Sequence, residues 1–215
     1  KIPLFIRQGS TVNLGDLNAG YLDVAPIFNL GTTQNLYLIY YTALPITTGY
    51  EIPSSFPVYY FRSVNVQNTT LNSNVSISDT LALDSGQFNI NGKTVTLNND
   101  AIAVGHGTIA GGTTSNIVFN GTTAATLPNV INGINNLTIN NSGGVTLSGN
   151  DTIYGTAIMN NGLLNTGSYT LTFANSATNP SEKSTSRIVG TAVMDSRSVG
   201  TGSIYFLNCN IASGG

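Results

Sequence analysis

The stretch at residues 63–99, SVNVQNTTLNSNVSISDTLALDSGQFNINGKTVTLNN, decides the fold. Its apolar residues come in pairs spaced by two, the period at which side chains return to the same face of a β-strand. The pairs are Val64/Val66, Val75/Ile77, Leu81/Leu83, Phe88/Ile90 and Val95/Leu97. From Val75 onward a new pair begins every six or seven residues, with Asn, Gly, Ser or Asp between the pairs. Strands this short and this closely set predict an all-β chain, a parallel β-solenoid with about three short strands in each coil.

A similar stretch recurs at residues 136–175. Residues 86–97, GQFNINGKTVTL, align without a gap with residues 162–173, GLLNTGSYTLTF. Upstream, SVNVQN at residues 63–68 resembles NLTINN at residues 136–141. Repetition at a long period is typical of stacked architectures, so we interpret residues 63–99 and 136–175 as an internal repeat.

The composition limits both the partners and the way in which the solenoid is held together. Of the 215 residues only 7% are charged, against roughly 25% in an average soluble protein, and the net charge is -2. This charge offers no basic surface for nucleic acid, and no apolar run approaches the roughly 20 residues of a membrane span, so we expect neither nucleic-acid binding nor membrane insertion. We expect Val, Ile, Leu and Phe to stack inside the coils and Asn side chains at the corners to form hydrogen-bonded ladders along the axis.

Residues 1–60 differ from the rest of the chain. They contain five of the seven prolines and seven of the ten tyrosines. The segments IPLFI, YLDVAPIF, NLYLIYYTAL and FPVYYF have strong β-propensity and are separated by Gly and Pro turns. We therefore expect an antiparallel β module or an N-terminal cap at residues 1–60, followed by the solenoid at residues 61–215. A cap would cover the unpaired backbone groups of the first coil.

The single cysteine, Cys209, excludes a disulfide within the chain and alternates with apolar residues in an expected strand at residues 203–211, so we expect it to point into the core. Few charges, one cysteine and many Asn and Thr residues favour an exported protein of the cell surface. The chain begins at Lys1 without a recognisable signal peptide, and we expect a mature form or part of a longer protein.

Few residues are candidates for chemistry. His106 is the only histidine and lies between two glycines, which predicts a turn residue and leaves no ordinary zinc site. The carboxylates of Asp79, Asp84, Asp100 and Asp151 are candidates for a catalytic pair or for weak calcium binding. Asp79-Thr80 and Asp151-Thr152 occupy similar places in the two repeat copies, which favours a turn role, and only Lys93 supplies a cation in the middle of the solenoid. We therefore assign no catalytic, cofactor-binding or metal-binding residue and predict a protein that is not an enzyme.

Two parts of the chain resemble known families. KIPLFIRQGS at residues 1–10 resembles the segment that follows the catalytic barrel in α-glucosidase-type glycoside hydrolases of family 31. FPVYYFRSVNVQN, NGLLNTGSYTLTFAN and EKSTSRIVGTAV, spread over residues 56–193, resemble in their order the repeat modules of long secreted surface proteins of the Bacteroidota and Ignavibacteria type. This second resemblance implies an extracellular right-handed β-helix with an adhesive or structural role.

The sequence thus predicts a non-enzymatic extracellular structural or adhesive repeat module, used in a surface layer or a filament. We expect it to associate with itself or to continue into further repeats. The alternative is a carbohydrate-binding or carbohydrate-processing β-helix with a glycan as its partner. A third hypothesis, a flat ice-binding or mineral-binding face, depends on the Thr-x-Thr pairs Thr94/Thr96 and Thr170/Thr172.

Overall fold

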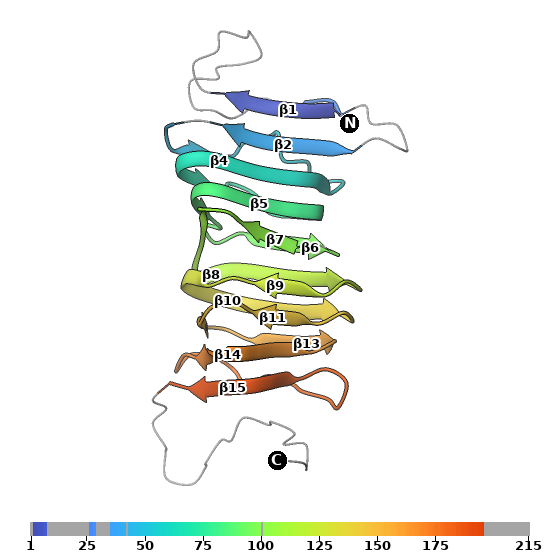
Figure 1. Ribbon diagram of the computed structural model, residues 1–215, viewed down its shortest axis with the longest axis vertical. Coiled ribbons are helices and arrows are strands. Elements are labelled where there is room, and N and C mark those ends of the chain that lie inside the picture. Colours follow the sequence, from blue (N-terminus) through green and yellow to red (C-terminus); the bar gives the residue numbers. More distant parts are fainter. Residues whose placement is uncertain (1, 8–25, 29–34, 42, 100, 196–215) are drawn as a thin grey trace.

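The computed structural model describes residues 2–7, 26–28, 35–41, 43–99 and 101–195, and these form the predicted parallel β-solenoid (Figure 1). Fifteen strands belong to one sheet, and the pairings between them are parallel. The strands are β1 (Ile2–Arg7), β2 (Leu36–Tyr41), β3 (Ile46–Thr47), β4 (Val58–Thr70), β5 (Val75–Asn89), β6 (Thr94–Asn98), β7 (Ala101–Val104), β8 (Thr108–Gly121), β9 (Ala125–Leu127), β10 (Val130–Asn141), β11 (Val145–Leu147), β12 (Asp151–Ile153), β13 (Ala157–Asn161), β14 (Leu164–Phe173) and β15 (Ile188–Met194).

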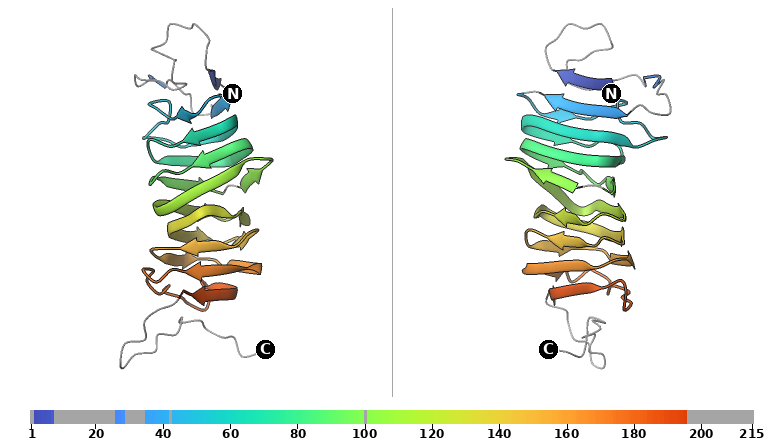
Figure 2. Two further views of the ribbon diagram at one scale, coloured as in Figure 1. Left: turned by 90° about the vertical axis from the view of Figure 1, so that its left-hand side faces the viewer. Right: turned by 45° about the vertical axis from the view of Figure 1, so that its right-hand side comes forward.

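The coils have three faces, and each strand stacks on the strand of the neighbouring coil (Figure 2). Face 1 contains β6 and β13, face 2 contains β1, β2, β7, β9 and β11, and face 3 contains β3 and β12. The longer strands β4, β5, β8, β10, β14 and β15 turn a corner and contribute to more than one face. The three short strands expected in each coil are therefore partly fused into one bent strand. β5 is an example, because its residues pair successively with β6, β7 and β8.

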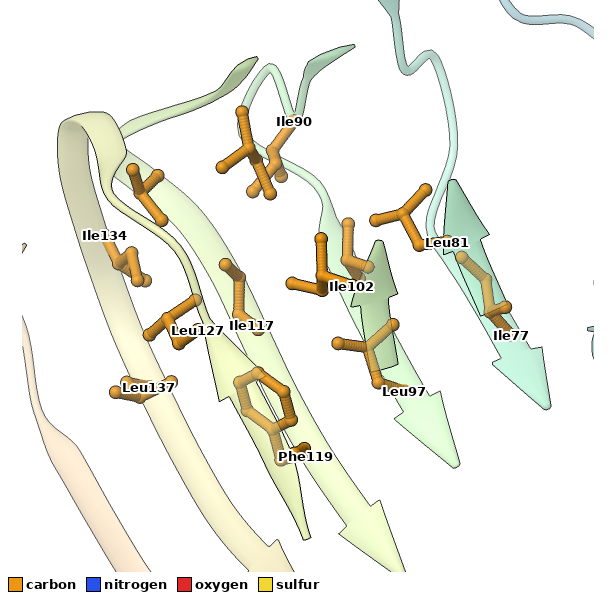
Figure 3. Packing of buried hydrophobic residues seen from close by; sticks show 14 of the residues in the cluster. Ile77, Leu81, Ile90, Leu97, Ile102, Ile117, Phe119, Leu127, Ile134 and Leu137 are labelled. Carbon is orange, nitrogen blue, oxygen red and sulfur yellow. The ribbon is translucent and has the colours of Figure 1, made fainter. Parts of the chain in front are cut away.

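The register between coils aligns the apolar residues into buried columns. On face 1, Val75 pairs with Val95, Val95 with Ile117, and Ile117 with Leu137, so that one coil takes 20 or 22 residues. Figure 3 shows side chains of successive coils, among them Ile77, Leu97 and Phe119, pointing into one narrow interior. A neighbouring column on the same face, all buried, consists of Ile77, Leu97, Phe119, Ile139 and Met159. Four of the five apolar pairs in residues 63–99 enter this continuous core. The pair Val64/Val66 does not, because Ser63 and Asn65 point inward there and Val66 is 62% exposed.

The described strands β1, β2 and β3 pair in parallel and continue the solenoid, so the antiparallel alternative is wrong for these strands, whereas the N-terminal cap stays a prediction. β1 pairs in parallel with β2, and β2 pairs in parallel with β4. β4 runs without a break across residues 60 and 61, where the boundary between module and solenoid was expected. The β-propensity of these segments was interpreted correctly, but propensity does not reveal strand direction. Most of YLDVAPIF and the expected strand at residues 203–211 lie outside the described residues.

Asparagine ladders connect the coils, as the sequence predicts. On face 1 the side-chain amide of Asn98 donates to Ser76 Oγ at 2.8 Å, that of Asn120 donates to Asn98 Oδ1 at 3.0 Å, and that of Asn140 donates to Asn120 Oδ1 at 2.7 Å. These contacts join the corners of successive coils and add a side-chain column to the backbone hydrogen bonds.

A second ladder follows the other edge of face 1. The backbone N–H of Thr94 donates to Asn74 Oδ1, the side-chain amide of Asn136 donates to Asn116 Oδ1, and the backbone N–H of Thr156 donates to Asn136 Oδ1, at 2.9–3.0 Å. Each of these oxygens accepts from the following coil. Face 1 is therefore bounded on both edges by axial rows of uncharged polar contacts.

The two sequence copies form the same local turn but lie on different faces. Asn89 Oδ1 accepts the N–H of Asn91, and Asn165 Oδ1 accepts the N–H of Gly167, both at 2.9 Å. The residues that end these turns, Asn91 and Gly167, have positive φ values of 52° and 58°. Residues 86–97 lead from face 3 to face 1, whereas residues 162–173 lead from face 2 to face 3. The repeat is thus a strand–turn–strand unit and does not correspond to the coil.

Candidate functional site

The carboxylates considered from the sequence lie apart. Asp79 and Asp84 flank the four residues of β5 that pair with β7, and five residues of extended strand span roughly 16 Å. Paired glycosidase carboxylates are about 5–9.5 Å apart. Asp151 lies several coils away in β12, and Asp100 is outside the described residues. The structure therefore does not bring Asp79, Asp84 and Asp151 together.

The expected equivalence of Asp79 and Asp151 is wrong. Asp79 precedes face 2 and accepts a hydrogen bond from the Thr80 hydroxyl at 3.2 Å. Asp151 lies in β12 on face 3, where it pairs with Leu171. The same Asp-Thr dipeptide therefore lies in two different environments, because the number of residues between the two copies is not a whole number of coils.

Asp84 has a cationic partner that the sequence did not indicate. Arg62 on β4 donates from Nε to Asp84 Oδ2 at 2.7 Å, and a second guanidinium nitrogen contacts the same oxygen. The side chains are 42% and 33% exposed, so the pair contributes little to the free energy of unfolding. Arg62 pairs in register with Ala82, so Asp84 is its diagonal neighbour in the next coil, 22 residues further along the chain. Arg62 is therefore a second described cation of the solenoid, in addition to Lys93, and it contacts one of the candidate carboxylates.

Among the described candidates from the sequence, Asp151 is the one buried carboxylate, with 3% of its surface exposed. Its Oδ1 accepts the backbone N–H of Val130 at 2.7 Å, whereas its buried Oδ2 has no hydrogen-bond partner among the described residues. Burial raises the pKa of Asp151 to about 7, against the opposing effect of the Val130 hydrogen bond. A buried carboxylate with a raised pKa is a candidate for proton transfer. However, the N–H that Asp151 accepts belongs to the backbone of the adjacent strand β10, and this hydrogen bond is a structural contact.

A second buried acid, Glu51, was missed by the sequence analysis. Its Oε1 accepts the Tyr40 hydroxyl at 2.5 Å and the backbone N–H of Gly49 at 2.7 Å. Both side chains are fully buried. Burial raises the pKa of Tyr40 well above its usual value, and the negative charge and hydrogen bond of Glu51 raise it further. The pair ties the loop after β3 to the interior of face 2.

The remaining candidate residues do not form a metal site within the described part of the chain. His106 is exposed in the bend between β7 and β8, which confirms the predicted turn position. Cys209 lies outside the described residues. In the part of the chain that the structure describes, no three His, Cys, Asp or Glu side chains group as metal ligands. Weak calcium binding stays a prediction.

The two Thr-x-Thr pairs do not share a face. Thr94 and Thr96 belong to β6 on face 1, whereas Thr170 and Thr172 belong to the part of β14 that pairs with β12 on face 3. The outward column that contains Thr96 continues through Val118, Thr138 and Ile158. The two pairs therefore do not form one regular threonine rank.

The aromatic residues gather in a different place, beside β2 and β4. A pocket of about 360 Å³ is lined by Phe28, Asn35, Leu36, Phe56, Pro57, Tyr59 and Ser78. Phe28 and Phe56 pack edge to face with their ring centroids 5.2 Å apart. Tyr59 packs against Tyr37 at 5.3 Å. The sequence showed the enrichment of tyrosine at residues 1–60 but not the pocket, because its lining combines four segments of the chain.

No helix among the described residues has the length and apolar character needed to cross a membrane. No protein-family model, curated protein sequence or solved structure matches this chain.

Proposed function

We propose that this chain is a non-enzymatic structural or adhesive module of the cell surface, used in a surface layer or a filament. The observation that supports it most is the continuous stack of coils, with ladders of side-chain hydrogen bonds along both edges of face 1. A coil takes 20 or 22 residues along face 1, and each coil adds one strand spacing of about 4.8 Å to the length. Such a design produces a stiff body with a large repetitive surface.

Uncharged asparagine side chains link the coils at the surface of face 1, and this favours a role outside the cell. Asn74, Asn98, Asn116 and Asn120 line face 1 and satisfy one another or the backbone of adjacent coils. Hydrogen bonds between uncharged amides are not screened by salt, unlike surface ion pairs. The module would therefore keep its coil-to-coil contacts under varying ionic conditions outside the cell.

The second candidate is the carbohydrate-related role. The aromatic pocket beside β2 and β4 favours binding. The separation of Asp79 and Asp84, and the engagement of Asp84 by Arg62, disfavour glycoside hydrolysis. Self-association and continuation into further repeats stay predictions, because residues 196–215 lie outside the described part of the chain.

Two measurements test the proposed function. Antibodies raised against the purified chain should label intact, non-permeabilised cells of the source organism, and label confined to the cytoplasm would contradict the extracellular role. The purified chain should release no reducing ends from soluble polysaccharides. Release that is abolished by Asp84→Asn or Asp151→Asn, with the unfolding midpoint preserved, would contradict the non-enzymatic role.

A further inference from the structure

The pocket beside β2 and β4 is built from rings that the fold holds in place. Val58 points into the core, so the next residue of β4, Tyr59, points outward. Tyr37 on β2 pairs with Tyr60 on β4, and its ring lies 5.8 Å from that of Tyr60 and 5.3 Å from that of Tyr59. Tyr59 is therefore supported by a row of aromatic side chains across two coils.

Another part of the lining consists of the Phe28 and Phe56 rings, which pack at an interplanar angle of 86°. Asn35 and Ser78 bring an amide and a hydroxyl to the same pocket. Among the described residues, the lining contains no Asp, Glu, Lys, Arg or His. The volume of about 360 Å³ lies near the lower end of the range for small-ligand sites.

We propose that this pocket binds a neutral sugar, a pyranose unit of an uncharged glycan. A pyranose ring has apolar C–H faces and a rim of hydroxyl groups. Its faces match the aromatic rings of Phe28, Phe56 and Tyr59, and its rim matches the hydrogen-bonding groups of Asn35 and Ser78.

The described lining residues carry no charge at neutral pH, and this separates the sugar from other ligands. A nucleotide or an anionic polysaccharide would bring negative charge to a site whose lining supplies no cation. A purely apolar ligand would desolvate the Asn35 amide and the Ser78 hydroxyl without replacing their hydrogen bonds. The inference names a ligand beyond the structural role proposed above, and each can hold without the other.

The test titrates the full chain with three neutral hexasaccharides, cellohexaose, mannohexaose and chitohexaose, by calorimetry and saturation-transfer NMR. An anionic galacturonate hexamer serves as the charged comparison. We expect saturable binding of at least one neutral hexamer and at least about tenfold weaker binding of the anionic one. Absence of binding by all three neutral hexamers, or equal binding of the anionic one, would overturn the sugar site.

Matched variants place the ligand in the pocket. Tyr59→Leu removes the ring and should weaken binding about tenfold, as for other buried aromatic anchors. Tyr59→Phe keeps the ring and should stay within about threefold of the original affinity, because stacking depends on the ring face. Tyr169→Leu removes an exposed tyrosine of β14 and should leave binding unchanged. Unchanged binding in Tyr59→Leu, or an equal loss in Tyr169→Leu, would refute the assignment.

If Tyr59→Leu does not fold, the rim supplies a second test. Asn35→Ala combined with Ser78→Ala removes the polar groups and should weaken binding while the unfolding midpoint is preserved. Unchanged affinity in this double variant would also refute the site. Release of reducing ends during the titration would contradict the non-enzymatic role and leave the sugar site standing.

Discussion

Asn120 donates a hydrogen bond from its side-chain amide to Asn98 Oδ1, at 3.0 Å and across 22 residues of sequence. Its own Oδ1 accepts from Asn140 of the following coil at 2.7 Å. The amide thus acts as donor toward one coil and as acceptor toward the next. Such a residue fixes the register of three coils at one corner.

Removal of this link should destabilise the solenoid. Asn120→Ala deletes both side-chain hydrogen bonds, each with a net value of about 0.5–1.5 kcal/mol, so we expect the free energy of unfolding to fall by about 1–3 kcal/mol. Equilibrium denaturation in urea measures the change. Asn160→Ala, at an exposed asparagine of β13, is the matched control and should change stability by less than about 0.5 kcal/mol. Equal effects of the two variants would show that the ladder carries no stability.

Asp151 should make stability depend on pH. Because its pKa is raised from 3.8 to about 7 in the folded chain, the unfolded chain loses this proton first as pH rises. The contribution of Asp151 to the free energy of unfolding should therefore be fully present below pH 3.8, fall through the interval up to about 7 and then level off. Each pH unit between the two pKa values lowers the contribution of Asp151 to the free energy of unfolding by about 1.4 kcal/mol, so the total loss is on the order of 4 kcal/mol.

Asp151→Asn isolates this effect, because the amide keeps an oxygen for the Val130 N–H but does not titrate. The stability of the variant relative to the original chain should rise between pH 4 and about 7. Urea denaturation at several pH values measures it, with Asp79→Asn as the control for a half-buried carboxylate. Parallel pH profiles for Asp151→Asn and the original chain would contradict the prediction.

Two glycines with left-handed backbone differ in the space around them. Gly162 has φ 84°, and an added Cβ would lie 1.8 Å from the carbonyl oxygen of Asn141. Gly167 has φ 58°, and its added Cβ would meet nothing within 4 Å. Gly167→Ala should cost about 1–2 kcal/mol for the backbone alone, and Gly162→Ala should cost more than about 4 kcal/mol because a neighbouring coil must move. Calorimetric melting of both variants measures the difference, and equal melting temperatures would show that the collision relaxes freely.

The Tyr40–Glu51 pair should behave as one unit. Tyr40→Phe removes the hydroxyl that donates to a fully buried carboxylate, and we expect it to lower the free energy of unfolding by about 2–4 kcal/mol. Glu51→Gln in the Tyr40→Phe background should then cost less than it does in the original chain. A double-mutant cycle from urea denaturation measures the coupling, and additivity within about 0.5 kcal/mol would contradict it.

The contacts within a strand or a turn and the presence of asparagine ladders were predictable, whereas the individual side-chain partners in adjacent coils were not. The spacing of Val75, Ile77 and Leu97 predicted their inward direction, and all three are buried. The richness in asparagine predicted ladders. The partnership of Arg62 with Asp84 depends on the coil length, which varies with the turns and with register shifts between β4 and β5. The coil length varies from 19 residues between Val145 and Leu164 to 24 residues between Leu164 and Ile188, and such a variable period cannot be read from a single sequence.

The sequence by itself determined the all-β class, the short strands, the turns that end them and the narrow apolar core. These follow from side-chain alternation and from backbone preferences within a few neighbouring residues. Only the tertiary structure decided the parallel direction of β1 and β2, the different faces taken by the two sequence copies and the aromatic pocket. Each of these depends on which residues of adjacent coils come into register. That alignment is set by the sum of all intervening turns and bulges, so it is a property of the stack and not of any local segment.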